Sequence, residues 1–201
     1  MKSLKTAAIA ATLFAASSAH AASIDLGTAG YSESSGDDLK AVWNATDNTE
    51  KTLSSLSAFT NVDTGNNTIA NLSINFDAGQ AQDIDFRFGL DGGYGVEIYV
   101  NNSVVFDTTN NIWWGGSNYN NAINVGDTFS AGSNSLNVYW AEDGNSGNQS
   151  AQFKLDGGDW QTLSVSNLEA VSAVPEPSTY ALMLGGLGLV GFMAARRRKN
   201  A

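Results

Sequence analysis

A regular alternation of apolar and polar residues runs through the middle of this chain and constrains its fold more than any other feature. The apolar positions are Ala70, Leu72, Ile74 and Phe76, then Ile84, Phe86, Phe88 and Leu90, then Val96, Ile98 and Val100. A period of two predicts strands with one buried face. Before the C-terminal region, no helical period of ten residues or more is present. The pattern therefore predicts an all-β domain, an antiparallel β-sandwich that is jelly-roll-like.

Other stretches extend this pattern or depart from it. Asn101-Asn102 predicts a two-residue hairpin loop because Asn tolerates positive φ, and residues 156–159 predict another hairpin turn. Residues 24–67 are irregular and polar, and we expect only one or two short strands or a short helix there. Three tryptophans lie on strand patterns and are expected in the core: Trp43, Trp140 and Trp160.

Both ends of the chain have the features of targeting segments. The first end has two lysines, an apolar stretch and the small residues Ala19 and Ala21, which predicts a signal peptide over 1–21 with cleavage after Ala21. At the other end an uncharged apolar run precedes four consecutive basic residues. We expect a single transmembrane helix over 178–195 and a basic tail over 196–199 that stays in the cytoplasm.

The C-terminal segment, 174–201, also contains a motif in three parts. Pro175-Glu176-Pro177 comes first, the apolar run second and Arg196-Arg197-Arg198 last. In this order and spacing the parts resemble the PEP-CTERM sorting signal of Gram-negative bacteria. The resemblance implies cleavage near the Pro-Glu-Pro sequence by a membrane-embedded exosortase, a transient inner-membrane anchor, and a final place at the cell surface or outside the cell. A plain single-span anchor with a rigid proline linker is the alternative.

The body between these ends, residues 22–173, has the length of one domain. The chain has 10 Lys and Arg and 20 Asp and Glu; six basic residues and one acidic residue lie in the ends, so four remain against 19, a net charge of about −15. Nucleic acid and anionic lipid are poor partners for such a surface. There is no cysteine, and the single histidine, His20, lies in the predicted signal peptide. Catalytic triads with histidine, cysteine nucleophiles and the common zinc sites are therefore excluded, and no cofactor is predicted.

A segment rich in aromatic residues follows the third strand region. Trp113, Trp114 and Tyr119 flank two glycines, and Asn118 lies beside them. Sugar rings stack on flat aromatic faces, and amides bind hydroxyl groups, so these four residues are the candidate ligand-binding set. The alternative is that one of the tryptophans caps the core.

Two further groups of polar residues have simpler interpretations. Asp143 and Asn145 offer oxygen ligands at alternating positions, which makes them a weak calcium candidate. A solvated hairpin loop is the favoured interpretation, because the rest of an EF-hand is missing, and no metal site is predicted. Asp83, Asp85 and Arg87 lie on the outward side of one strand and are read as an ordinary soluble strand face.

The strand region also shows a resemblance of its own. The sequence from Leu90 to Asp107 is similar to the central hairpin of PA14-like domains, and residues 136–155 are similar to later strands of that fold. The resemblance covers about 65 residues and implies a PA14-like sandwich that binds glycans. Some members bind them through calcium, but the paired adjacent aspartates of those members have no counterpart at Asp91-Gly92.

These observations lead to three hypotheses for function. The first is an exported, non-enzymatic surface or matrix protein, associated with exopolysaccharide and biofilm, that binds glycan or a protein partner. The second is a carboxylate-dependent glycan hydrolase or lyase, which needs two carboxyls about 5 to 9.5 Å apart across a cleft. The third is a purely structural matrix protein. Signal peptidase, exosortase and the membrane are expected partners during export, and exopolysaccharide is a candidate partner afterwards.

Overall fold

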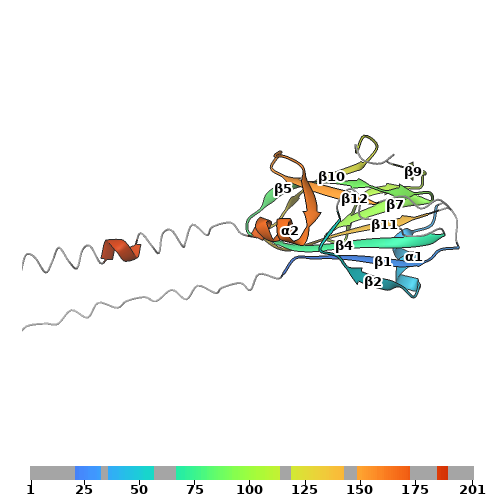
Figure 1. Cartoon of the computed structure of the whole chain (residues 1–201), viewed down its shortest axis with the longest axis horizontal. Helices are drawn as coiled ribbons and strands as arrows, with labels where there is room; N and C mark the ends of the chain where they lie inside the picture. Colours follow the sequence, from blue (N-terminus) through green and yellow to red (C-terminus); the bar gives the residue numbers. More distant parts are fainter. Residues whose placement is uncertain are drawn as a thin grey trace, which may run out of the picture.

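Two antiparallel sheets pack face to face in the computed structural model (Figure 1), which describes residues 21–32, 36–56, 67–113, 119–142, 149–172 and 185–189. In spatial order, the larger sheet consists of β2 (Thr49–Thr52), β1 (Ser23–Gly30), β4 (Thr68–Ala78), β11 (Gly132–Ala141), β7 (Gly95–Val100) and β8 (Ser103–Thr108). The smaller sheet consists of β10 (Ile123–Phe129), β5 (Gln82–Gly89), β12 (Ser150–Leu155), β13 (Gln161–Ser164) and β3 (Ser55–Leu56). The predicted antiparallel sandwich is confirmed.

Three short elements complete the described part of the chain. β6 (Asp91–Gly92) pairs with β9 (Ile112–Trp113) in a two-stranded ribbon. Helix α1 (Leu39–Ala45) and helix α2 (Val165–Ser172) are seven and eight residues long. Residues 185–189 are also helical. No helix in these described ranges is both long and apolar enough to cross a membrane, and most of the predicted span 178–195 lies outside them.

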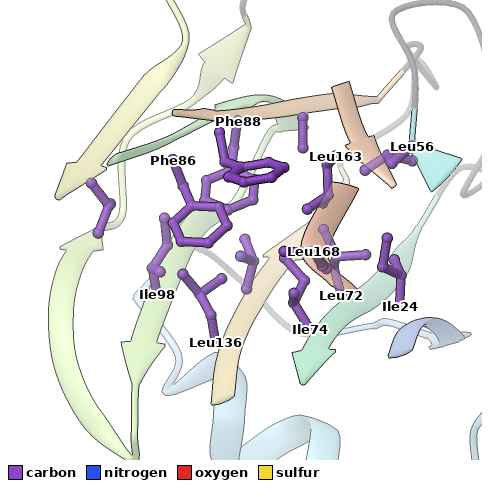
Figure 2. Packing of buried hydrophobic residues seen from close by; sticks show 14 of the residues in the cluster. Ile24, Leu56, Leu72, Ile74, Phe86, Phe88, Ile98, Leu136, Leu163 and Leu168 are labelled. Atoms are coloured by element: carbon purple, nitrogen blue, oxygen red, sulfur yellow. The ribbon is translucent and has the colours of Figure 1, made fainter. Parts of the chain in front are cut away.

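The inward faces of both sheets meet in one apolar core (Figure 2). Phe86 of β5 is fully buried, and its ring centroid lies 6.0 Å from those of Phe88 and Phe153 and 5.8 Å from that of Phe129. Leu72 and other residues of the larger sheet close the core from the opposite side. Each such side chain stabilises the fold by about 1.5–3 kcal/mol relative to an exposed one. The alternating residues therefore specify which faces of the two sheets meet.

The predicted hairpin loops are confirmed, whereas the N-terminal part of the body is more regular than expected. Asn101 and Asn102 both have positive φ, 46° and 67°, and join β7 to β8. Such a pair gives the turn whose twist matches two antiparallel strands. The expectation for 24–67 was wrong at its start, because β1 is an eight-residue strand paired with both β2 and β4. Ile24 and Leu26 are its inward residues, but Thr28 and Gly30 follow at the same spacing, so the apolar alternation is too short to indicate an eight-residue strand.

The sandwich has two dissimilar ends. At one, β1 begins, β4 ends and α2 ends; the Ser172 hydroxyl donates to the Asp77 carbonyl oxygen at 2.7 Å. We call this the terminal end, since the chain enters and leaves the described sandwich there (Figure 1). The opposite end, the distal end, holds the β6–β9 ribbon and the start of β12.

The outer sides of the two sheets differ as well. Helix α1 packs on the larger sheet, where Leu39 and Trp43 join Tyr139 in a second buried apolar cluster, and we call this the covered face. Trp43 is buried as expected, although it lies on a helix. The outer side of the smaller sheet carries Asp85 and Arg87, and no helix of the described chain packs over these residues; we call it the open face.

Candidate functional site

At the distal end, a large aromatic side chain stands in solvent on an ordered element. Trp113 lies opposite Asp91 in the β6–β9 ribbon, and its side chain is 65% exposed. The ribbon lies close on the sheet below, because a Cβ at Gly92 would come within 3.0 Å of the Gly95 carbonyl oxygen and of Val96. Trp113 is therefore an exposed flat surface that the backbone holds in place.

A buried polar network lies next to this ribbon. The Gln149 side chain is fully buried, and its Oε1 accepts a hydrogen bond from the Asp91 backbone N–H at 2.9 Å. Its Nε2 donates to Glu142 Oε1 at 2.8 Å, and Glu142 is only 1% exposed. Buried polar groups that are hydrogen-bonded make an arrangement rigid and specific. Gln149 thus connects β6 to the end of β11 and the start of β12.

Tyr119 has a supporting position rather than an exposed one. It is 8% exposed, has a φ of 55°, and its hydroxyl hydrogen-bonds that of Ser150. Burial raises the pKa of Tyr119 above its usual value, although the hydrogen bond to Ser150 and the charge of Arg87 oppose this shift. The Arg87 guanidinium carbon lies 4.3 Å from the centre of its ring. Tyr119 therefore contacts both Ser150 at the distal end and Arg87 on the open face.

Trp160 was expected in the core, and this prediction was wrong. It lies just before β13, is half-buried, and is placed on the open face. Its ring centre is 4.3 Å from the Arg87 guanidinium carbon and 5.0 Å from Lys154 Nζ. The alternation around residue 160 indicates a strand position, but Trp160 follows the turn at Asp156 and Gly157 and precedes β13. Its ring packs against the cations Arg87 and Lys154 on the open face and does not enter the core.

Aspartates gather at the other half of the open face, toward the terminal end. Asp83, Asp85, Asp127 and Asp156 border a hollow of about 510 Å³. Lys154 Nζ lies 3.0 Å from Asp85 Oδ2, and the Thr128 hydroxyl donates to Asp83 Oδ1 at 2.6 Å. Within the described ranges, no group of three or more His, Cys, Asp or Glu residues is arranged to hold a metal ion.

Most of the other residues singled out from sequence lie outside the described residues. These are Trp114, Asn118, Asp143, Asn145, Ala19, Pro175, Glu176, Pro177, Arg196, Arg197 and Arg198. Ala21 begins the described chain and is exposed. Glu142 and Gln149 were not predicted as a buried pair, since nothing in a single sequence distinguishes a buried carboxylate or amide from the many exposed ones.

Comparison with a protein-family model identifies the end of the chain. Residues 173–199 match the model described as the PEP-CTERM protein-sorting motif. The chain thus ends in a PEP-CTERM sorting motif, as its three-part sequence predicted. The motif implies processing by exosortase, export and sorting to the cell surface. No curated protein matches the sequence.

Comparison with solved structures concerns the body. The chain is similar to a PA14 sugar-binding domain from an RTX adhesin, at 15% identity over 71% of this chain and 96% of that one, with a TM-score of 0.47. It is similar to the PA14 domain of the MpAFP antifreeze protein, at 16% identity over 78% and 94%, with a TM-score of 0.49. An anti-sigma factor domain-containing protein is 8% identical over 72% and 47%, with a TM-score of 0.50. The body is similar in structure to PA14 domains, and at these identities the likeness concerns the fold alone.

Proposed function

We propose that this chain is an exosortase-processed protein of the cell surface or extracellular matrix, and that its sandwich binds glycan at the distal end without catalysis. We propose that the protein is associated with exopolysaccharide and with biofilm. The observation that supports binding most directly is the 65% exposed Trp113 indole on an ordered ribbon. An ordered, exposed indole face is the kind of surface on which a sugar ring stacks.

The surroundings of Trp113 support the same proposal. The network of Gln149 and Glu142 fixes the ribbon before any ligand arrives, so little ordering free energy is lost on binding. Trp114 and Asn118, which follow along the chain, are proposed to extend the aromatic surface and to bind sugar hydroxyl groups. The acidic body favours neutral sugars as the main ligand.

The position of the site fits display at a surface. Helix α2 ends with Ser172 at the terminal end, whereas β9, the strand that carries Trp113, lies at the opposite end of the sandwich (Figure 1). A protein attached through its C-terminal side would therefore present Trp113 away from the attachment. This arrangement leaves the glycan site accessible to polysaccharide outside the cell.

Glu142, the buried carboxylate next to the ribbon, is poorly placed for hydrolysis. Glu142 is 1% exposed and accepts a hydrogen bond from Gln149, so it has no open path to a glycosidic oxygen. A glycosidase needs two carboxyls that both reach the scissile bond. We therefore propose binding rather than cleavage, and a purely structural role is the outcome that a failed binding test would support.

The test is a panel of neutral glycans immobilised on beads, with the full-length chain in a detergent that contains no sugar. Trp113→Ala should weaken retention about tenfold, since a stacked aromatic anchor commonly provides that much affinity. Val104→Ala is the control, because Val104 is also exposed, at 57%, but lies on edge strand β8. Equal retention of both variants and the parent would reject the Trp113 site, and new reducing ends or unsaturated sugars would reject the non-enzymatic proposal.

The sorting part of the proposal has a separate measurement. Mass spectrometry of the mature C-terminus, in cells with and without exosortase, should find cleavage near Pro175-Glu176-Pro177 only when the enzyme is present. An unprocessed C-terminus in both kinds of cell would contradict the proposal.

A further inference from the structure

Arg87 on the open face is held in a fixed position by three neighbours. Its guanidinium carbon lies 4.3 Å from the ring centres of both Tyr119 and Trp160. Its Nε donates to Gln152 Oε1 at 2.7 Å, and Nη2 donates to the same oxygen. Aromatic contacts of this kind and a side-chain amide orient the planar group without neutralising its charge.

The same guanidinium has no carboxylate partner in the described part of the chain, although the body is strongly acidic. Asp85, two residues earlier on β5, is paired with Lys154 instead. Gln152 accepts from Nε and Nη2 through one oxygen, so Nη1 keeps N–H groups that no described residue accepts from. An oriented arginine without a counterion is the arrangement that proteins use to bind a carboxylate through two hydrogen bonds.

We propose that Arg87 and Trp160 form a second glycan subsite that binds the carboxylate of a uronic acid residue. The carboxylate would accept from the free edge of the guanidinium. The sugar ring would lie against the half-buried Trp160, beside the Lys154 ammonium. This subsite goes beyond the proposed neutral-glycan site, because it uses different residues and a different part of the ligand.

The overall negative charge decides which acidic glycan fits. A net charge of about −15 on the body repels a dense polyanion. At physiological salt this repulsion is screened over about 8 Å, so a single carboxylate in contact with Arg87 feels mainly its local partner. The ligand class is therefore a polysaccharide with isolated uronic acid residues among neutral sugars, rather than a continuous polyuronate.

The experiment compares matched sugars that differ in one carboxylate. The full-length chain, in sugar-free detergent, is passed over columns carrying cellobiouronic acid or cellobiose, and over a second pair carrying a galacturonate-terminated or galactose-terminated disaccharide. We expect at least one acidic sugar to be retained about tenfold more strongly than its neutral counterpart, as charge-assisted hydrogen bonds imply. Arg87→Gln should remove this preference. Lys51→Gln, which removes the same charge from exposed strand β2, should preserve it.

Further variants keep the proposal open to rejection. If Arg87→Gln does not fold, Arg87→Lys retains the charge without the planar fork, and it should still lose most of the preference. Trp113→Ala should leave the preference intact, which separates this subsite from the distal one. Equal retention on acidic and neutral columns would overturn the proposal, as would a preference that survives both Arg87 variants or is lost in Lys51→Gln. Equal retention on beads that carry a carboxylate without sugar would overturn the assignment to a glycan.

Discussion

The covered face and the open face of this sandwich are made in opposite ways. On the covered face, Leu39 and Trp43 of α1 are buried against the larger sheet, and the Glu97 carboxylate fixes the start of the helix by accepting from the Leu39 and Lys40 N–H groups at 2.7 and 3.2 Å. On the open face, charged and polar side chains pair across neighbouring strands, as Asp85 does with Lys154.

This difference indicates that one face of the sandwich provides stability and that the other face is available for binding. A buried aromatic residue and a buried, hydrogen-bonded carboxylate are expensive to change, because the surroundings cannot supply new partners. Removing one partner of an exposed ion pair costs little stability, because water replaces that partner. The covered face is therefore expected to determine stability, and the open face is free to carry a binding site.

The largest effect is expected from Trp43→Ala. The Trp43 ring occupies space above Gly27 of β1, where a Cβ would come within 2.5 Å of the indole. Removal of a buried tryptophan leaves a cavity and should lower the free energy of unfolding by about 3–5 kcal/mol. Urea unfolding followed by circular dichroism measures this loss. The matched variant is Trp160→Ala on the open face, for which we expect a loss of about 1 kcal/mol from the cation contacts. Similar losses in the two variants would contradict the division between faces.

A smaller effect on the covered face depends on pH. Burial and then the hydrogen bond to Glu97 Oε2, at 3.0 Å, raise the pKa of Tyr99, and burial and the Glu97 charge raise the pKa of Tyr139. The folded state therefore keeps protons that the unfolded state releases near pH 10, so this stability is complete below about pH 10 and is lost as the pH rises further.

Tyr99→Phe tests this pH dependence. At pH 7 the variant should lose about 1 kcal/mol, the usual value of one hydrogen bond. Above about pH 10 its stability should fall less steeply than that of the parent, by up to about 1.4 kcal/mol per pH unit. Urea unfolding from pH 7 to pH 11 gives both quantities. Parallel curves for the two proteins would show that Tyr99 does not titrate differently in the folded state.

The sequence predicts the inner faces of the sandwich well because apolar alternation is a local signal. Phe86 and Phe88 each face the core as their spacing requires, and the Asn101-Asn102 loop follows from the tolerance of Asn for positive φ. Strand β10 was not predicted, because Asp127 stands between Val125 and Phe129 at a position where the alternation requires an apolar residue. That strand pairs with β5 through backbone hydrogen bonds, which no side-chain pattern records.

The candidate sites were predicted less completely, for a physical reason. Trp113 could be found from sequence because an aromatic residue in a glycine-rich segment is conspicuous. The contact between Gln149 and Asp91 joins residues 58 positions apart, and that between Arg87 and Gln152 spans 65. Such partners are brought together only when the two sheets form. A single sequence shows that Arg87 is one of few cations, but it does not show that its guanidinium is oriented without a carboxylate.

The smallest effect is expected from Lys154→Met on the open face. The side chains of Lys154 and Asp85 are 24% and 44% exposed, so water screens their 3.0 Å ion pair. Methionine keeps most of the aliphatic stem that packs on the sheet and removes only the charge. We expect the free energy of unfolding to fall by about 0.5 kcal/mol or less at low salt, and the difference from the parent to vanish in about 1 M salt. Urea unfolding at both salt concentrations measures this. A loss as large as that of Trp43→Ala would mean that the open face, too, is part of the structural framework, and it would remove the reason for expecting a binding site there.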